Sequence, residues 1–99
     1  MGTKRVKVIV KPVGKAPHIE YTDNTLKAFQ RIVDGYIETV TVAKDLIVIC
    51  NEEGRLRGLP YNCKVFGVDF VGDIALVGVN GFNFADCPLK LADANKLFP

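Results

Sequence analysis

Apolar and polar residues alternate with a period of two along several short stretches of the chain, a pattern typical of half-buried β-strands. The stretches are residues 4–10, which end in an apolar run, 18–22 and 36–42, and the mostly apolar residues 73–79 predict a further strand. Residues 46–50 (LIVIC) are continuously apolar, which predicts a central strand covered on both faces. A turn at 51–54, ending in an αL bulge at Gly54, is expected to lead into a short strand at 55–59. Residues 61–72 mix apolar residues with turn formers, so the pattern leaves strand and loop open there.

One stretch, about residues 24–34, has the spacing of an amphipathic helix instead. Its apolar residues recur on one helix face: Leu26, Phe29, Ile32 and Val33. Asp23 and Asn24 are N-cap candidates, and Gly35 stands where a glycine commonly follows a helix.

Turn signals join these elements into a fold. Asn80-Gly81 predicts a tight hairpin with a returning arm at 82–84, and Pro88 allows a short helix through about Phe98. The predicted class is α+β: a mostly antiparallel sheet of about five to seven strands, one main helix on a face and a short C-terminal helix. The length of 99 residues predicts a single domain over 1–99.

Composition narrows the setting of the protein. Hydrophobic residues make up 48% and charged residues 24%, which excludes wholesale disorder, and no apolar run is long enough for a transmembrane helix. No apolar segment of a signal peptide follows the basic N-terminus. Three cysteines form an odd set without a close pair, so we expect reduced thiols and a cytoplasmic protein.

The charge is unevenly distributed. The net charge is +2, but residues 1–15 carry five basic and no acidic residues, which leaves −3 on the rest of the chain. This basic segment predicts either attraction to phosphates and nucleic acid or lysine protection of an edge strand.

Catalytic patterns are absent from the sequence. There is no serine, and a thiol nucleophile such as Cys50 would need the single histidine, His18, beside it. Cys50, Cys63, Cys87 and His18 lack the close spacing of a zinc site. Glu52 and Glu53 would hold a metal only if the turn brought their carboxylates together. The geometry of a hairpin turn would account for both residues without a metal. We therefore expect no enzyme activity, no metal and no cofactor.

A polar cluster is the candidate ligand site. If 55–59 is a strand, Arg55 and Arg57 face the same side, and a guanidinium pair suits phosphate. Tyr61 or Tyr36 would stack on a base, and Asn62 would read a polar base edge. The predicted ligand-binding residues are Tyr36, Glu38, Asn51, Arg55, Arg57, Tyr61 and Asn62. A hairpin turn and a solvated strand face would account for the same residues without a ligand.

Four segments carry a resemblance to a known family: residues 25–30 (TLKAFQ), 33–38 (VDGYIE), 50–56 (CNEEGRL) and 58–62 (GLPYN). Together they resemble a family of small uncharacterised domains from bacteriophages, mobile elements and Gram-positive bacteria. Asp34 departs from the pattern, since glycine is common there. The resemblance covers about residues 6–80 and implies a fold type and a bacterial or phage setting, but no activity and no catalytic residue.

These observations favour a non-enzymatic binding domain that captures a small anionic, nucleotide-type ligand. In a phage, this capture would sequester a host defence signal. The alternative is a protein–protein module that binds a host factor through a sheet edge or through the hairpin with Phe82 and Phe84. Binding of nucleic acid through the basic first strand is a third hypothesis. A homo-oligomer is expected, because tight sites in small chains often lie at symmetric interfaces.

Overall fold

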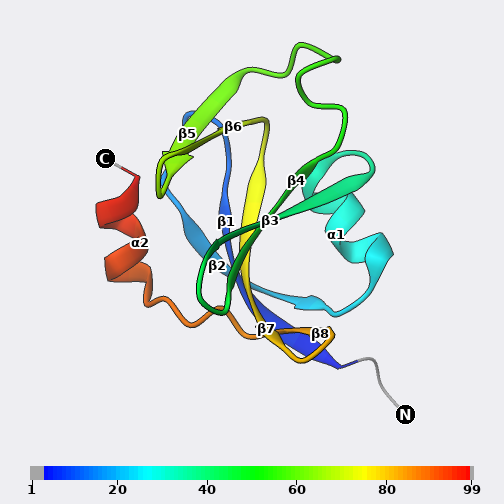
Figure 1. Cartoon of the computed structure of the whole chain (residues 1–99), viewed down its shortest axis with the longest axis vertical. Helices are drawn as coiled ribbons and strands as arrows, with labels where there is room; N and C mark the ends of the chain where they lie inside the picture. The colour runs from blue at the N-terminus through cyan, green and yellow to red at the C-terminus, as the bar shows by residue number, and fades with distance from the viewer. Residues whose placement is uncertain (1–3, 99) are drawn as a thin grey trace.

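The computed structural model describes residues 4–98. They form a six-stranded antiparallel sheet, a separate two-stranded sheet and two helices, which confirms the α+β prediction (Figure 1). The main sheet runs in the order β2-β1-β7-β4-β3, and β8 also pairs with β7. Its strands are β1 (Arg5–Lys11), β2 (His18–Asp23), β3 (Ile37–Ala43), β4 (Leu46–Asn51), β7 (Ile74–Asn80) and β8 (Asn83–Ala85). The remaining elements are α1 (Leu26–Val33), β5 (Tyr61–Val65), β6 (Val68–Val71) and α2 (Leu91–Leu97).

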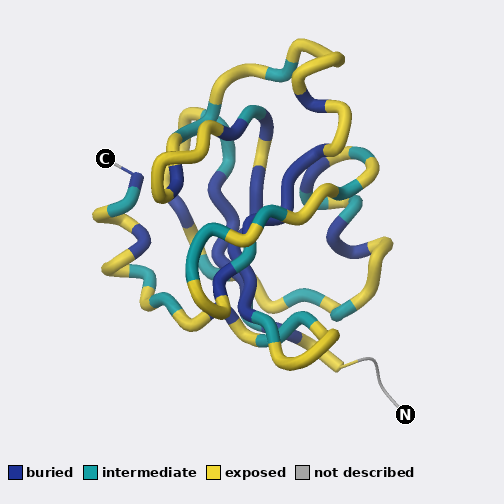
Figure 2. Tube along the Cα trace, in the orientation of Figure 1, coloured by how far each residue is buried: buried dark blue, intermediate teal, exposed yellow. Residues whose placement is uncertain are grey.

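The main sheet is covered on both faces, and its central strands are the most buried part of the chain (Figure 2). On the α1 face the buried cluster is Val6, Val8, Val10, Phe29, Val33, Ile49, Ala75 and Val77. The β5–β6 hairpin and α2 cover the other cluster: Ile9, Leu46, Val48, Cys50, Val65, Phe70, Ile74, Leu76, Cys87, Ala94 and Phe98. Val48 and Ile49 are neighbours in β4, yet both are fully buried because they point to opposite faces. Burying each contributes about 1.5–3 kcal/mol, as expected for the central strand that the sequence predicted.

Helix α1 begins at Leu26, two residues after the predicted start at about residue 24. The N-cap is Thr25, whose side-chain oxygen accepts a hydrogen bond from the Ala28 N–H at 3.2 Å. The prediction of Asp23 or Asn24 as N-cap is wrong, because β2 continues through Asp23 and the Asn24 amide donates to the Phe84 carbonyl at 3.1 Å. Leu26, predicted to face the core, is 58% exposed, whereas Phe29 and Val33 of the same predicted face are buried.

The predicted strand at 55–59 is wrong. The segment between β4 and β5 is a series of compact turns, held by Arg57 N–H to Glu53 C=O at 2.8 Å and Leu59 N–H to Gly54 C=O at 2.9 Å. Gly54 has no positive φ, so the predicted αL bulge is wrong too. The glycine is needed for space, because a Cβ there would lie 2.9 Å from Val71 Cγ2.

Residues 61–72, which the sequence left open, form the β5–β6 hairpin over the face that α2 shares. Both residues at its tip, Phe66 (φ 46°) and Gly67 (φ 84°), have positive φ. This is the mirror-image turn that matches the twist of paired strands.

The C-terminal third agrees with the sequence. Asn80-Gly81 turns β7 into β8, and Phe84 packs edge-on against Phe29 with ring centroids 5.1 Å apart. Phe82 is fully exposed at the hairpin tip. Among the residues described, no helix is long and apolar enough to cross a membrane.

Candidate functional site

The structure places five of the seven predicted ligand-binding residues in two separate clefts and the other two outside both. Glu38, Asn51 and Arg55 line a cleft between β3, β4 and β6, and Tyr61 and Asn62 line a different cleft beside α2. Arg57 and Tyr36 lie on neither of these clefts. The seven residues therefore do not line one common cleft, and the expected strand at 55–59 had placed only Arg55 and Arg57.

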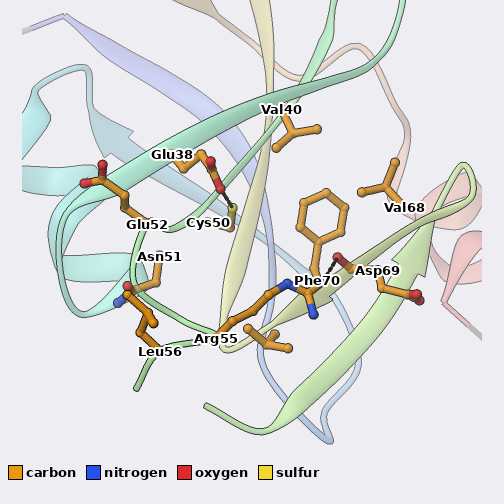
Figure 3. A pocket seen from close by; sticks show the side chains of 11 residues that line it. Glu38, Val40, Cys50, Asn51, Glu52, Arg55, Leu56, Val68, Asp69 and Phe70 are labelled. Atoms are coloured by element: carbon orange, nitrogen blue, oxygen red, sulfur yellow. Dashed lines mark hydrogen bonds between the residues drawn. The ribbon is translucent and has the colours of Figure 1, made fainter. Parts of the chain in front are cut away.

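The first cleft, which we call the acidic cleft, has a volume of about 400 Å³ (Figure 3). Three carboxylates line it, from Glu38, Glu52 and Asp69, against the single guanidinium of Arg55. Val40 and Phe70 supply apolar side chains between them. An excess of negative charge disfavours an anionic ligand here.

Asn51 is buried and uses its amide internally. Its two N–H groups donate to the Val33 carbonyl at 3.0 Å and the Asp34 carbonyl at 3.1 Å, and its oxygen accepts from the Glu53 N–H at 2.8 Å. The side chain thus joins the end of α1 to the turn after β4. Gly35 makes this approach possible, since a Cβ there would lie 2.6 Å from Asn51 Nδ2. No N–H of Asn51 remains free for a ligand.

The two arginines do not converge. Arg55 donates from Nη2 to the Asp69 carbonyl at 3.2 Å, whereas Arg57 donates from Nη1 to the Asp34 carbonyl at 2.7 Å. Each guanidinium braces its turn against a different element, so the predicted phosphate fork is absent from this pair.

Cys50 lies in the acidic cleft but is a poor nucleophile. Burial raises the pKa of its thiol to about 11, and the neighbouring Glu38 carboxylate adds to the effect. The thiol donates to Glu38 Oε1 across 3.8 Å. A group with this pKa stays protonated near neutral pH. His18 is half-exposed on β2, where it pairs with Glu20 at 2.6 Å.

The second cleft consists of two adjoining pockets that share Lys11, Asn62 and Phe98; we call it the lysine cleft. Their volumes are about 540 and 350 Å³. The larger pocket also contains Tyr61, Lys64 and Phe66, and the smaller one contains Lys15 from the β1–β2 loop. Within the described chain, no carboxylate is among the lining residues of either pocket. The lysine cleft therefore has the opposite charge character from the acidic cleft.

Lys11 is the most unusual residue of the lysine cleft because it is buried, with 7% of its surface exposed. Its ammonium donates to the Pro12 carbonyl at 2.8 Å and to Asn62 Oδ1 at 3.1 Å, and lies 6.0 Å from the centre of the Phe98 ring. These partners are neutral. Among residues 4–98 it forms no ion pair, although a buried charge is normally paired.

Asn62 acts as a clamp beside this ammonium. Its amide donates to the Lys11 carbonyl and to the Gly72 carbonyl, both at 2.7 Å, while its oxygen accepts from Lys11 Nζ. Both N–H groups are occupied, so Asn62 positions Lys11 and has no donor left for a base edge.

Tyr61 and Lys64 form the outer side of the lysine cleft. The Tyr61 hydroxyl donates to Asp69 Oδ1 at 2.8 Å, which raises the pKa of the phenol and lowers that of the Asp69 carboxyl. Lys64 Nζ lies 3.5 Å from the same oxygen. Asp69 therefore offsets part of the Lys64 charge, whereas Lys11 and Lys15 have no such carboxylate among the described residues.

The sequence does contain a signal for the burial of Lys11, which was not among the predicted site residues. Lys11 has the same parity in β1 as Ile9, whose side chain is buried on the face covered by α2. Period-two alternation thus places the ammonium on a covered face. No group of three His, Cys, Asp or Glu residues within 4–98 is arranged to hold a metal ion.

Comparison with known proteins gives a family but no activity. No curated protein matches the chain, and no solved structure matches it. The model of a family described as a domain of unknown function, DUF3846, matches residues 6–97. Because this match spans nearly the whole chain of 99 residues, the protein belongs to the DUF3846 family of domains of unknown function.

Proposed function

We propose that the protein is a non-enzymatic binding domain that captures a small anionic ligand of nucleotide type in the lysine cleft. One observation carries this proposal: among residues 4–98 the buried Lys11 ammonium has only neutral partners, and it lies where two pockets meet that no described carboxylate lines. An anionic group in the cleft would supply the missing counter-charge. In this proposal lysines bind the phosphate in place of Arg55 and Arg57, because both arginines donate to main-chain carbonyls outside the lysine cleft.

The two halves of the lysine cleft suit the two halves of such a ligand. Lys11 and Lys15 approach the smaller pocket, which fits the phosphate end. Tyr61 and Phe66, both more than half exposed, border the larger pocket and offer faces for a planar ring. A phosphate about 4 Å from an ammonium gains about 4 kcal/mol of Coulomb energy at an effective dielectric constant of ~20, before desolvation is subtracted.

The chemistry supports capture in preference to turnover. The buried thiols of Cys50 and Cys87 and the half-buried thiol of Cys63 all have raised pKa values, chiefly through burial, so none is an activated nucleophile. All three cysteines are free, in keeping with a reducing compartment. The proposed setting is the cytoplasm of a bacterium or a phage-infected cell, where capture would sequester a nucleotide-type signal.

Thermal stability with a probe series tests the proposal. The probes are AMP, ATP, pyrophosphate and uncharged adenosine. At 100 times the dissociation constant, a bound probe adds about 2.7 kcal/mol, which raises the Tm of a domain this small by roughly 10 °C or more. We expect the shift with the anionic probes and its loss in Lys15→Ala and Lys64→Ala. Lys27→Ala, on the exposed side of α1, is the matched control and keeps the shift.

A different variant distinguishes the two clefts. Arg55→Ala removes the one cationic side chain among the described lining residues of the acidic cleft and removes no lining residue of the lysine cleft. We expect it to retain the ligand-induced shift. If Arg55→Ala abolishes the shift while Lys15→Ala keeps it, the ligand binds in the acidic cleft and the proposal is wrong.

A second candidate function rests on Phe82. Its ring is fully exposed at the tip of the β7–β8 hairpin, an arrangement typical of an anchor for a protein partner. A partner captured from a host lysate should be lost with Phe82→Ala and retained with Lys15→Ala. The reverse pattern would assign the interaction to the lysine cleft.

A further inference from the structure

Strand β3 forms an outer edge of the main sheet and pairs only with β4 among the described residues. Outer strands are usually protected against pairing by lysine, proline or alternating charge. The opposite edge strand, β2, carries His18, Glu20 and Asp23. In contrast, β3 (IETVTVA) is rich in β-branched residues and has one charge, on Glu38. This edge is therefore open to pairing in a way that β2 is not.

The direction of the unpaired groups follows from the hydrogen bonds to β4. The Tyr36 carbonyl accepts from the Glu52 N–H at 2.8 Å, so the main-chain groups of Tyr36 point toward β4. Because successive residues of a strand point their N–H and C=O groups to opposite sides, those of Thr39 and Thr41 point away from β4. Both threonines are exposed. The open edge thus presents two donors and two acceptors at matching intervals.

The sequence of this edge is complementary to itself. In an antiparallel pair of two β3 strands centred on Val40, Thr39 of each copy exchanges both main-chain hydrogen bonds with Thr41 of the other. Val40 then lies against Val40, an apolar contact at the closely spaced position. The two Glu38 carboxylates are offset by four residues, roughly 14 Å at the rise of a strand, so their repulsion is screened. A pair centred on Thr39 would bring them to a diagonal distance of about 7–8 Å.

We propose that β3 pairs with β3 of a second copy in this register, which joins the two main sheets into one continuous sheet across a two-fold axis. The β-bulge between Thr41 and Ala43 ends the regular part of the edge just beyond these pairs. Glu38 and Val40 line the acidic cleft, so the second copy lies beside that cleft. This interface is independent of the lysine cleft and of any ligand bound there.

Amide hydrogen exchange of the wild-type chain tests the pairing directly. We expect the Thr39 and Thr41 amides to become protected as the protein concentration rises, because only the dimer gives them acceptors. The Glu38 and Val40 amides, bonded to β4, should stay protected at every concentration. At about 1 mM even a weak dimer forms. If the chain sediments as a monomer at this concentration and the Thr39 and Thr41 amides are unprotected, the proposal is overturned.

A pair of variants at one position provides the control. Thr39→Pro removes an N–H that the monomer does not use but that each copy donates across the interface. Losing two such bonds should raise the dimer dissociation constant about 30-fold in sedimentation equilibrium. Thr39→Val keeps the N–H and the branched shape, so its dissociation constant should stay within about threefold of wild type. Equal dimerisation of both variants contradicts the proposal, and if Thr39→Pro does not fold, the exchange pattern of the wild type decides.

Discussion

Replacing Asn51 by alanine removes the side chain that joins α1 to the turn after β4. The Val33 carbonyl loses its partner at 3.0 Å in a buried bond, and the Glu53 N–H loses its partner at 2.8 Å in a partly buried one. The Asp34 carbonyl loses one bond but keeps the Arg57 guanidinium at 2.7 Å. At about 1 kcal/mol for each lost bond, and more where a buried group stays unpaired, the free energy of unfolding should fall by about 2–4 kcal/mol.

Urea denaturation followed by circular dichroism measures this loss. The matched control is Asn83→Ala, since Asn83 is exposed at the β7–β8 hairpin, and it should change the free energy of unfolding by less than about 0.5 kcal/mol. In thermal unfolding, the Asn51 loss corresponds to a Tm decrease of roughly 10–25 °C for a chain of this size. If Asn51→Ala costs under about 1 kcal/mol, the amide does not hold the turn, and its assignment as a structural residue is refuted.

Further predictions concern single positions. Thr25→Ala removes the N-cap of α1 and should lower the free energy of unfolding by about 1 kcal/mol in urea, whereas Thr25→Ser should retain most of it. Phe66→Asn should stabilise the chain by about 0.5–1 kcal/mol, because asparagine tolerates the positive φ better than phenylalanine; a loss would show that the ring packs in the hairpin. The pKa of the Cys50 thiol is raised from 9.0 to about 11, chiefly by burial, so the folded state favours the neutral thiol. The resulting stabilisation is complete below pH 9 and is lost as the pH rises through about 11, so urea titrations over this window should show a steeper fall for wild type than for Cys50→Ala.

Local signals predicted most of the sheet. Asn80-Gly81 has the residues that a two-residue hairpin requires. The continuous apolar run of β4 is typical of a strand that is covered on both faces. These features depend on neighbouring residues alone, so the sequence was sufficient for them.

The sequence did not predict the features that depend on contacts between distant segments. The β5–β6 hairpin has a phenylalanine at a positive φ, where turn rules expect glycine or asparagine, so its tip gave no signal at Phe66. Residues 55–59 alternate like a strand, yet the main chain there bonds to itself in turns. This error also misplaced the predicted phosphate site, because the pairing of the two arginines depended on the strand. The lysine cleft joins β1, the β5–β6 hairpin and the end of α2, which only the tertiary fold brings together.

Backbone amide chemical shifts during titration with ATP test the central claim most directly, because the two clefts have separate amides. Binding in the lysine cleft predicts saturable shifts at Gly14, Lys15, Asn62 and Gly67, with little change at Glu52 and Arg55. The same titration of Lys15→Ala should need a higher ATP concentration to reach the same shifts. Shifts confined to Glu52 and Arg55, or no saturable shift with ATP, AMP or pyrophosphate, would contradict capture of an anionic ligand in the lysine cleft.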